Sequence, residues 1–198
     1  MAIAASVVKE LRDKTGAGML ECKKALEASS GDVGAAVEYL RKHGLAAAQK
    51  RADRAAEEGL VESYIHPGGK IGVLIEVNSE TDFVARTDEF KILARDLAMQ
   101  VAAAAPLAVR REELPDDLVE KEKEILTAQT EGLKKPPQVI EKIVAGKLEK
   151  FYKEVCLMEQ AYIKDPKKSV QDRVKETMSV LGENIVVRRF ARFKLGAD

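Results

Sequence analysis

An acidic and a large aromatic side chain stand next to each other at Asp82 and Phe83, within the stretch VNSETDFVAR at residues 77–86. The apolar run before them, IGVLIEV, predicts a strand that ends at Asn78, so the pair falls in the turn that follows. In one reading, Asp82 accepts backbone N–H groups as a helix cap and Phe83 enters the core. In the other, both are exposed at the tip of the turn, where the ring anchors a partner and the carboxylate acts on its charges. The residue types alone leave both readings open.

Histidine, the side chain most used in acid–base and metal chemistry, occurs only at His43 and His66. Two histidines are too few for a metal cluster or a histidine-based catalytic triad. A helix end, where the helix dipole favours a cation, accounts for His43. The run HPGGKIG contains Gly-Gly-Lys but lacks the spacing and the following helix of a phosphate-binding loop. We therefore expect no enzyme active site, no bound metal and no cofactor.

The sequence RRFARF, residues 188–193, interleaves arginines with phenylalanines. Such a strand can bind single-stranded RNA, because rings stack on bases and arginines contact phosphates. Arginines along the rim of a sheet, with the rings in the core, give the same pattern. The chain carries 33 basic and 33 acidic residues, whereas nucleic-acid binders need an excess of positive charge. This balance favours the second interpretation and a protein that binds another protein.

The remaining composition is typical of a soluble cytoplasmic protein. The two cysteines, Cys22 and Cys156, lie far apart without CxxC spacing, so neither a disulfide framework nor a zinc site is indicated. Free thiols fit a reducing compartment. No stretch is long and apolar enough to span a bilayer, and the N-terminus becomes polar too early for a signal peptide. We expect no contact with a membrane.

Residues 1–45 predict a module of three short helices. Thr15-Gly16-Ala17-Gly18 separates the first two helices, because glycine accepts backbone angles that a helix interior forbids. Asp32 is expected to cap the third helix, and Gly44 to lie just past its end. The layout resembles the ubiquitin-associated fold. The alanine-rich and charged stretch 46–58 then predicts a solvated helical connector.

Residues 59–198 predict a core domain. Two apolar runs flank Pro67-Gly68-Gly69, which indicates a β-hairpin. After the Asp82-Phe83 turn, Thr87 is expected to cap a long helix that Pro106 ends. That helix has one apolar stripe, formed by Phe90, Leu93, Leu97 and Val101.

Between this helix and the last strand, the segment from about residue 116 to residue 152 predicts two charged helices joined at GLKKPP. A thin apolar seam, in which Leu118, Ile125 and Leu126 face Ile140, Ile143, Val144 and Leu148, favours a helical hairpin that projects from the body. Two ordinary helices packed on the sheet remain the alternative. A final strand at NIVVRRFARFKL closes a small antiparallel sheet, so the predicted fold class is α+β.

Three blocks of the sequence, taken together, resemble one family. They are KELRDKTGAGMLECKKALEASSGD, HPGGKIGVLIEVNSETDFVAR and LGENIVVRRF. They look like the signature blocks of bacterial elongation factor Ts, in the expected order and over essentially the whole chain. The resemblance implies a translation elongation factor that acts as guanine-nucleotide exchange factor for elongation factor Tu and promotes release of GDP without covalent chemistry. A passive binding or scaffold protein is the alternative.

The resemblance also implies roles for individual residues. The three-helix module would dock on the nucleotide-binding domain of elongation factor Tu through Arg12, Met19 and Leu20. A second set would reach the magnesium and phosphate site of that partner, with the histidine as a helper: Thr81, Asp82, Phe83, Val84 and His66. Longer relatives supply the histidine and the aspartate–phenylalanine pair from two core repeats. This chain has one core that carries both, so the short form implies a homodimer. Some short-form members crosslink that dimer through a cysteine at the position of Ala191.

Overall fold

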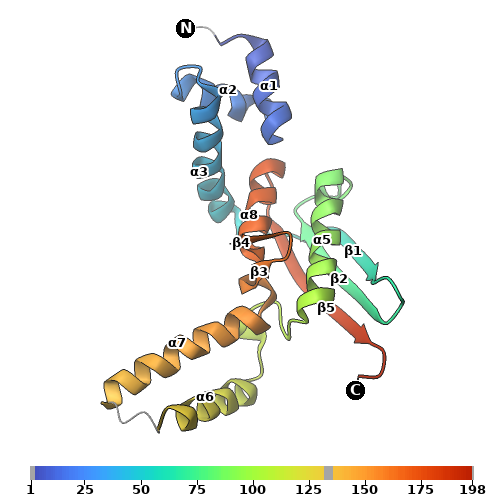
Figure 1. The fold of residues 1–198 in the computed structure, drawn as a ribbon. Coiled ribbons are helices and arrows are strands. Elements are labelled where there is room, and N and C mark those ends of the chain that lie inside the picture. Colours follow the sequence, from blue (N-terminus) through green and yellow to red (C-terminus); the bar gives the residue numbers. More distant parts are fainter. Residues whose placement is uncertain (1–2, 132–135, 198) are drawn as a thin grey trace. The chain divides into compact units, whose positions relative to one another are not determined.

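The computed structural model describes residues 3–131 and 136–197. The chain divides into two compact units, each built from segments that are distant in sequence. The first unit contains Met1–Glu62, Glu76–Asp96 and Asp172–Arg188, and the second contains Ser63–Ile75, Leu97–Gln171 and Arg189–Asp198. N-terminal helices, a small antiparallel sheet and further helices make up the architecture (Figure 1), which confirms the predicted α+β class.

Three helices form the N-terminal part of the first unit, namely α1 (Ala5–Thr15), α2 (Met19–Ala28) and α3 (Val33–Arg51). Helix α1 ends at Gly16, which has φ 69° and donates its N–H to the carbonyl of Arg12 at 2.7 Å. This left-handed residue is a common helix ending, and it favours glycine. The helices share a small core of Val8, Leu11, Cys22, Ala25, Leu26 and Ala36.

Helix α3 is longer than the sequence predicted. The carboxylate of Asp32 accepts a hydrogen bond from the N–H of Ala35 at 2.7 Å, which confirms the predicted cap. The predicted end before Gly44 is wrong, because the helix continues through it to Arg51. A single glycine costs a helix only about 1 kcal/mol, and the alanine-rich run that follows has high helix propensity. The chain then runs through residues 52–57 outside any helix or strand.

The sheet consists of β1 (Glu58–Ile65), β2 (Ile71–Ser79) and β5 (Ile185–Lys194), with β2 in the middle. The predicted hairpin between β1 and β2 is confirmed. The N–H of His66 donates to the carbonyl of Ile71 at 2.9 Å, and Gly68 and Gly69 supply the positive φ angles of the turn. Along β2, buried and more exposed residues alternate, so one face is covered and the other is open.

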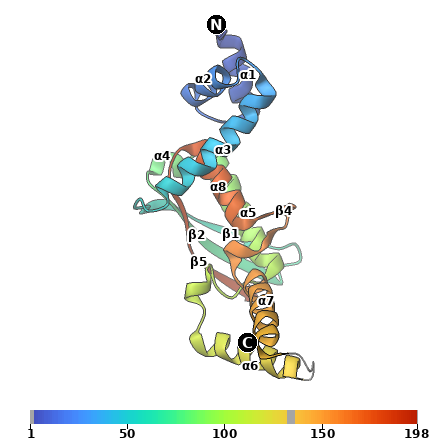
Figure 2. The same ribbon diagram turned by 90° about the vertical axis from the view of Figure 1, so that its left-hand side faces the viewer.

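Helix α5 (Asp88–Ala104) carries a continuous buried apolar face. The hydroxyl of Thr87 accepts a hydrogen bond from the N–H of Phe90 at 3.3 Å, which confirms the predicted cap. The predicted stripe is confirmed as well, because all four of its residues are fully buried: Phe90, Leu93, Leu97 and Val101. The short helix α4 (Asp82–Ala85) lies just before it, at the end of β2 (Figure 2).

Two helices of the second unit, α6 (Asp116–Glu131) and α7 (Pro137–Val155), form the predicted helical hairpin and lie side by side in both views (Figures 1 and 2). The ammonium of Lys147 donates to the side chain of Gln129 across the pair at 3.2 Å. Leu126 and Val144 are buried, but Ile125, predicted for the seam, is 52% exposed. Most of the predicted break GLKKPP lies outside the described residues.

Arg111 ties the base of this hairpin together. It lies in the 3-10 turn η1 (Arg111–Glu113) and donates to Glu159 of a second such turn, η2 (Leu157–Glu159), at 2.7 Å. It also donates to Glu149 of α7, and its guanidinium lies 4.5 Å above the ring of Tyr152. The hydrogen bonds from Arg111 lower the pKa of the Glu149 carboxyl. Through these contacts, the turn before α6 is bonded both to α7 and to the turn that follows α7.

The last elements are β3 (Ala161–Tyr162), β4 (Asp165–Ser169) and α8 (Val170–Leu181). Strands β3 and β4 pair in an antiparallel hairpin that the sequence did not predict. Helix α8 buries Val170, Val174 and Met178 along one face, and Gly182 with φ 78° leads toward β5. Across the described part of the chain, no helix combines the length and the apolar character needed to cross a bilayer.

Candidate functional site

The turn after β2 is a capped helix start. Thr81 has extended backbone angles, and its hydroxyl accepts a hydrogen bond from the N–H of Val84 at 3.5 Å. The buried hydroxyl of Ser79 donates to the carbonyl of Thr81 at 2.8 Å. These short-range bonds end the strand and begin α4 within two residues. The turn that carries the predicted exchange residues is therefore an ordered structure with its own hydrogen bonds.

Phe83 does not enter the core, since 79% of its surface is exposed. The side chain of Asp82 is 43% exposed and accepts a charged hydrogen bond from Arg86 at 2.6 Å. Thr81, not Asp82, supplies the side-chain cap of α4. Of the two readings of this pair, the one with both side chains at the surface is confirmed, and the core position for Phe83 is wrong.

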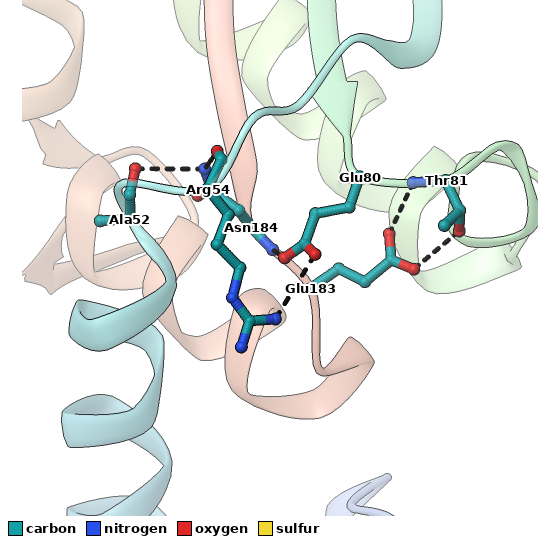
Figure 3. A network of polar contacts seen from close by, with 6 residues as sticks. All are labelled: Ala52, Arg54, Glu80, Thr81, Glu183 and Asn184. Atoms are coloured by element: carbon teal, nitrogen blue, oxygen red, sulfur yellow. Dashed lines mark hydrogen bonds and ion pairs between the residues drawn. The ribbon is translucent and has the colours of Figure 1, made fainter.

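Glu183, two residues before the start of β5, holds the turn from a distant part of the sequence. Its carboxylate accepts the N–H of Thr81 at 3.0 Å on one oxygen and the hydroxyl of Thr81 at 2.7 Å on the other (Figure 3). Hydrogen bonds to a charged acceptor are stronger than those between neutral groups. The first residue of the TDFV segment is thereby fixed at both its backbone and its side chain.

Asn184, the next residue, extends this network to the segment after α3 (Figure 3). Its backbone N–H donates to Glu80 at 2.7 Å, and its side-chain amide donates to the carbonyls of Ala52 and Arg54 at 3.2 and 2.6 Å. The guanidinium of Arg54 reaches Glu80 at 3.4 Å. Asn184 is 2% exposed, and its donors are satisfied by protein acceptors, as buried polar groups usually are. All of these residues belong to the first compact unit.

The predicted docking residues are exposed on the three-helix module. Arg12 lies in the last turn of α1 and is exposed. Met19 and Leu20 begin α2 and are 45% and 64% exposed, while Cys22 and Leu26 of the same helix enter the core. The first turn of α2 thus presents two apolar side chains that the module's own core does not use.

His66 lies in the second compact unit, whereas the Thr81–Val84 segment lies in the first. Its ring is 3.1 Å from the hydroxyl of Tyr64, measured from Nδ1. The histidine lines a surface depression of about 320 Å³ together with Ile71, Met99, Ile163 and Arg192. His66 is exposed there.

The open face of the sheet in the second unit is apolar. A Cβ at Gly72 would lie 3.1 Å from the side chain of Ile65, so Ile65 lies over Gly72. Leu74, two residues further along β2, shares that face. Arg192 donates to the carbonyl of Ala102 on α5, so its neighbour Phe193 points to the opposite, open face. The three side chains concerned are 66%, 48% and 68% exposed: Ile65, Leu74 and Phe193.

This geometry bears on the alternative readings of the sequence. The guanidinium of Arg192 is engaged with the end of α5, so the arginines of RRFARF are not all free. The core position expected for the rings of this strand is wrong for Phe193, which is 68% exposed. Within residues 3–131 and 136–197, no group of three or more histidine, cysteine, aspartate or glutamate side chains is arranged to hold a metal ion. Both cysteines are buried free thiols.

Sequence reasoning missed the residues that hold the turn, namely Glu80, Glu183 and Asn184. Their contacts to one another and to Thr81 join positions about a hundred residues apart. The available signal was the block LGENIVVRRF, which contains Glu183 and Asn184 directly before the last strand. The block pointed to a role for these residues without indicating their partners.

The comparisons with known proteins agree with this arrangement. The sequence model of the family described as "Elongation factor TS" matches residues 4–197. The proteins named elongation factor Ts of Carboxydothermus hydrogenoformans and Thermodesulfovibrio yellowstonii are both 59% identical to this chain, over 98% and 99% of its length. The match covers 89% and 98% of those proteins. The protein of that name from Geobacter sulfurreducens is 60% identical over 99% of this chain and 91% of its own length.

These matches define the class of the protein as a translation elongation factor. The chain belongs to the elongation factor Ts family.

Proposed function

We propose that this protein is a guanine-nucleotide exchange factor that binds elongation factor Tu with GDP and promotes release of the nucleotide. One observation carries the proposal: Phe83 is 79% exposed on a turn that is fixed by hydrogen bonds from two directions. An exposed aromatic side chain on a rigid support is a typical anchor of a protein interface. The family membership of the chain supports the same activity.

The mechanism follows from linkage. Tight binding of GDP relies on Mg²⁺, which neutralises phosphate charge, and on backbone N–H groups around the diphosphate. A protein that binds the nucleotide-free partner more tightly must weaken nucleotide binding by the same factor. Each tenfold weakening requires about 1.4 kcal/mol of differential binding. Burial of Phe83 against the partner supplies part of this energy, and the carboxylate of Asp82 disturbs the arrangement of groups that hold Mg²⁺.

Docking precedes this step. Met19 and Leu20 provide apolar contact area on the nucleotide-binding domain of the partner, and Arg12 provides a cation. His66 assists at the same nucleotide site. No bond of the protein is made or broken, so the factor acts by binding alone and needs no cofactor. We place this activity in the cytoplasm, with no direct contact to nucleic acid or membrane.

We also propose a homodimer, formed through the open face of the sheet. Ile65, Leu74 and Phe193 lie there and are exposed, and a second copy would remove this apolar area from water. Sedimentation equilibrium at micromolar concentration is then expected to give twice the chain mass. Phe193→Asp should give the monomer mass, whereas Ile125→Asp, an equally drastic change on the exposed side of α6, should leave the dimer intact. A monomer mass for the unchanged chain would refute the dimer.

The exchange activity is tested by release of a fluorescent GDP analogue from elongation factor Tu in the presence of excess unlabelled GDP. We expect this chain to accelerate release strongly at substoichiometric amounts. A folded sample that binds the partner without accelerating release would refute exchange and support the scaffold alternative, in which the three-helix module only tethers.

A further inference from the structure

We propose that Glu183 is a positioning residue for nucleotide exchange. Its carboxylate fixes the Thr81–Val84 turn in the geometry that presents Phe83 and Asp82 to the partner. The inference rests on the proposed exchange function and adds to it a residue that does not itself contact the partner's nucleotide site.

The first line of support is the pair of hydrogen bonds between Glu183 and Thr81. One oxygen of Glu183 accepts the backbone N–H at 3.0 Å and the other accepts the hydroxyl at 2.7 Å. The same hydroxyl oxygen accepts the N–H of Val84 at 3.5 Å. Glu183 therefore directs the hydroxyl proton toward itself and leaves a lone pair for the cap of α4. The orientation of α4, and of Phe83 on it, follows from this arrangement.

The second line of support is that Glu183 is itself held in place by its neighbour. The backbone N–H of Asn184 donates to Glu80, which directly precedes Thr81, at 2.7 Å. The side chain of Asn184 donates to the carbonyls of Ala52 and Arg54. Residues 183 and 184 thus form a corner that joins the turn to the chain segment leaving α3, the last helix of the docking module (Figure 3). Three segments distant in sequence meet there.

The local bonds of the turn do not replace this corner. The buried hydroxyl of Ser79 holds only the carbonyl of Thr81, at 2.8 Å, and does not engage its N–H. The bond from the N–H of Val84 to the hydroxyl of Thr81 is long at 3.5 Å, and the Asp82–Arg86 pair lies at the surface. Exposed pairs of this kind contribute little to order. Without the carboxylate, the N–H of Thr81 loses its partner and the turn gains freedom. Because misplacement of a functional group by about 1 Å can cost up to roughly a hundredfold in rate, exchange is sensitive to such freedom even when folding is not.

The test separates maximal rate from affinity. The rate of GDP release from elongation factor Tu is measured against the concentration of the factor for the unchanged chain, Glu183→Ala and Glu183→Gln. Removing the carboxylate is expected to lower the maximal rate about tenfold, with half-saturation within about twofold, because the docking surface is intact. The amide oxygen of Glu183→Gln keeps one acceptor and should restore part of the rate. Glu120→Ala, on the exposed surface of α6, is the control without effect.

A second comparison guards against loss of folding in Glu183→Ala. Thr81→Val removes only the hydroxyl, so Thr81→Val and Glu183→Gln should lower the rate by less in combination than the product of their separate effects. If the double variant lowers the rate by the full product of the two separate effects, the inference is overturned. A maximal rate in folded Glu183→Ala equal to that of the unchanged chain would also overturn it. No acceleration by the unchanged chain would instead refute the exchange function itself.

Discussion

The guanidinium of Arg86 lies 2.6 Å from Oδ2 of Asp82, one helical turn earlier on the surface of the protein. The carboxylate that we propose to act at the partner's metal site is thus already paired in the free protein. An ion pair of this exposure is worth at most about 1 kcal/mol, so a partner can separate it at small cost. The ion pair with Arg86 therefore orients the Asp82 side chain before a partner binds, without preventing contact with that partner.

Asp82→Ala is therefore expected to slow GDP release while changing the free energy of unfolding by less than about 1 kcal/mol. Urea unfolding and release of the GDP analogue measure the two effects. Asp117→Ala is a matched control, because Asp117 makes the same kind of pair with Lys121 on α6, also exposed. That variant should keep both stability and exchange. Equal slowing by both variants would assign the effect to net charge.

Phe90→Ala is expected to destabilise the fold by about 3–5 kcal/mol, because deleting a buried aromatic ring leaves a cavity. Phe90 is fully buried at the start of α5. Phe83→Ala, seven residues earlier and 79% exposed, should change stability by less than about 0.5 kcal/mol. Urea unfolding of the two variants measures this contrast. Comparable losses would mean that Phe83 is a core residue.

Gly59→Ala is expected to destabilise the sheet by about 2 kcal/mol or more. Gly59 has φ 141°, and a Cβ there would overlap the carbonyl oxygen of Val77 and lie 2.7 Å from the Cα of Asn78. Gly146→Ala is the control, because a Cβ at this position in α7 would meet open space. That change should stabilise the protein by about 0.5–1 kcal/mol through helix propensity. Thermal unfolding of both variants measures whether Gly59→Ala lowers the melting temperature and Gly146→Ala raises it.

Burial raises the pKa of the Cys156 thiol from 9.0 to about 11. The unfolded chain therefore releases this proton first, so the contribution of the thiol to stability is complete below pH 9 and is lost between pH 9 and about 11. Over that range, the unchanged chain should lose more stability than Cys156→Ala. Urea unfolding at several pH values measures the difference. Parallel curves for the two proteins would contradict a buried thiol.

The elements with strong local signals were predicted well. Thr87 and the four apolar residues after it define α5 by cap and period, and Pro67-Gly68-Gly69 defines the β-hairpin. Gly44 misled the prediction, because the propensity of the following alanines outweighs one glycine. The β3–β4 hairpin escaped notice because DPKKS has no apolar alternation.

The site was predicted only in part, for a physical reason. Phe83 and Asp82 stand out by type and position, and the resemblance to a known family implies roles for them that remain a prediction. Glu183 holds the turn through contacts to a residue 102 positions away. Such a contact leaves no periodic or local pattern in the sequence, so it emerges only when the chain is folded. The side chains exposed at the turn could thus be identified from the sequence, whereas the distant residue that holds the turn could not.

We propose that the exposed ring on the TDFV turn drives nucleotide release. The most direct test is the rate of GDP release from elongation factor Tu at saturating factor, compared between the unchanged chain, Phe83→Ala and Leu107→Ala. Leu107 is 60% exposed in the second unit and controls for general loss of apolar surface. We predict that Phe83→Ala slows release at least about tenfold, as loss of an interface anchor does, and that Leu107→Ala has no effect. Full activity of a folded Phe83→Ala would contradict the account.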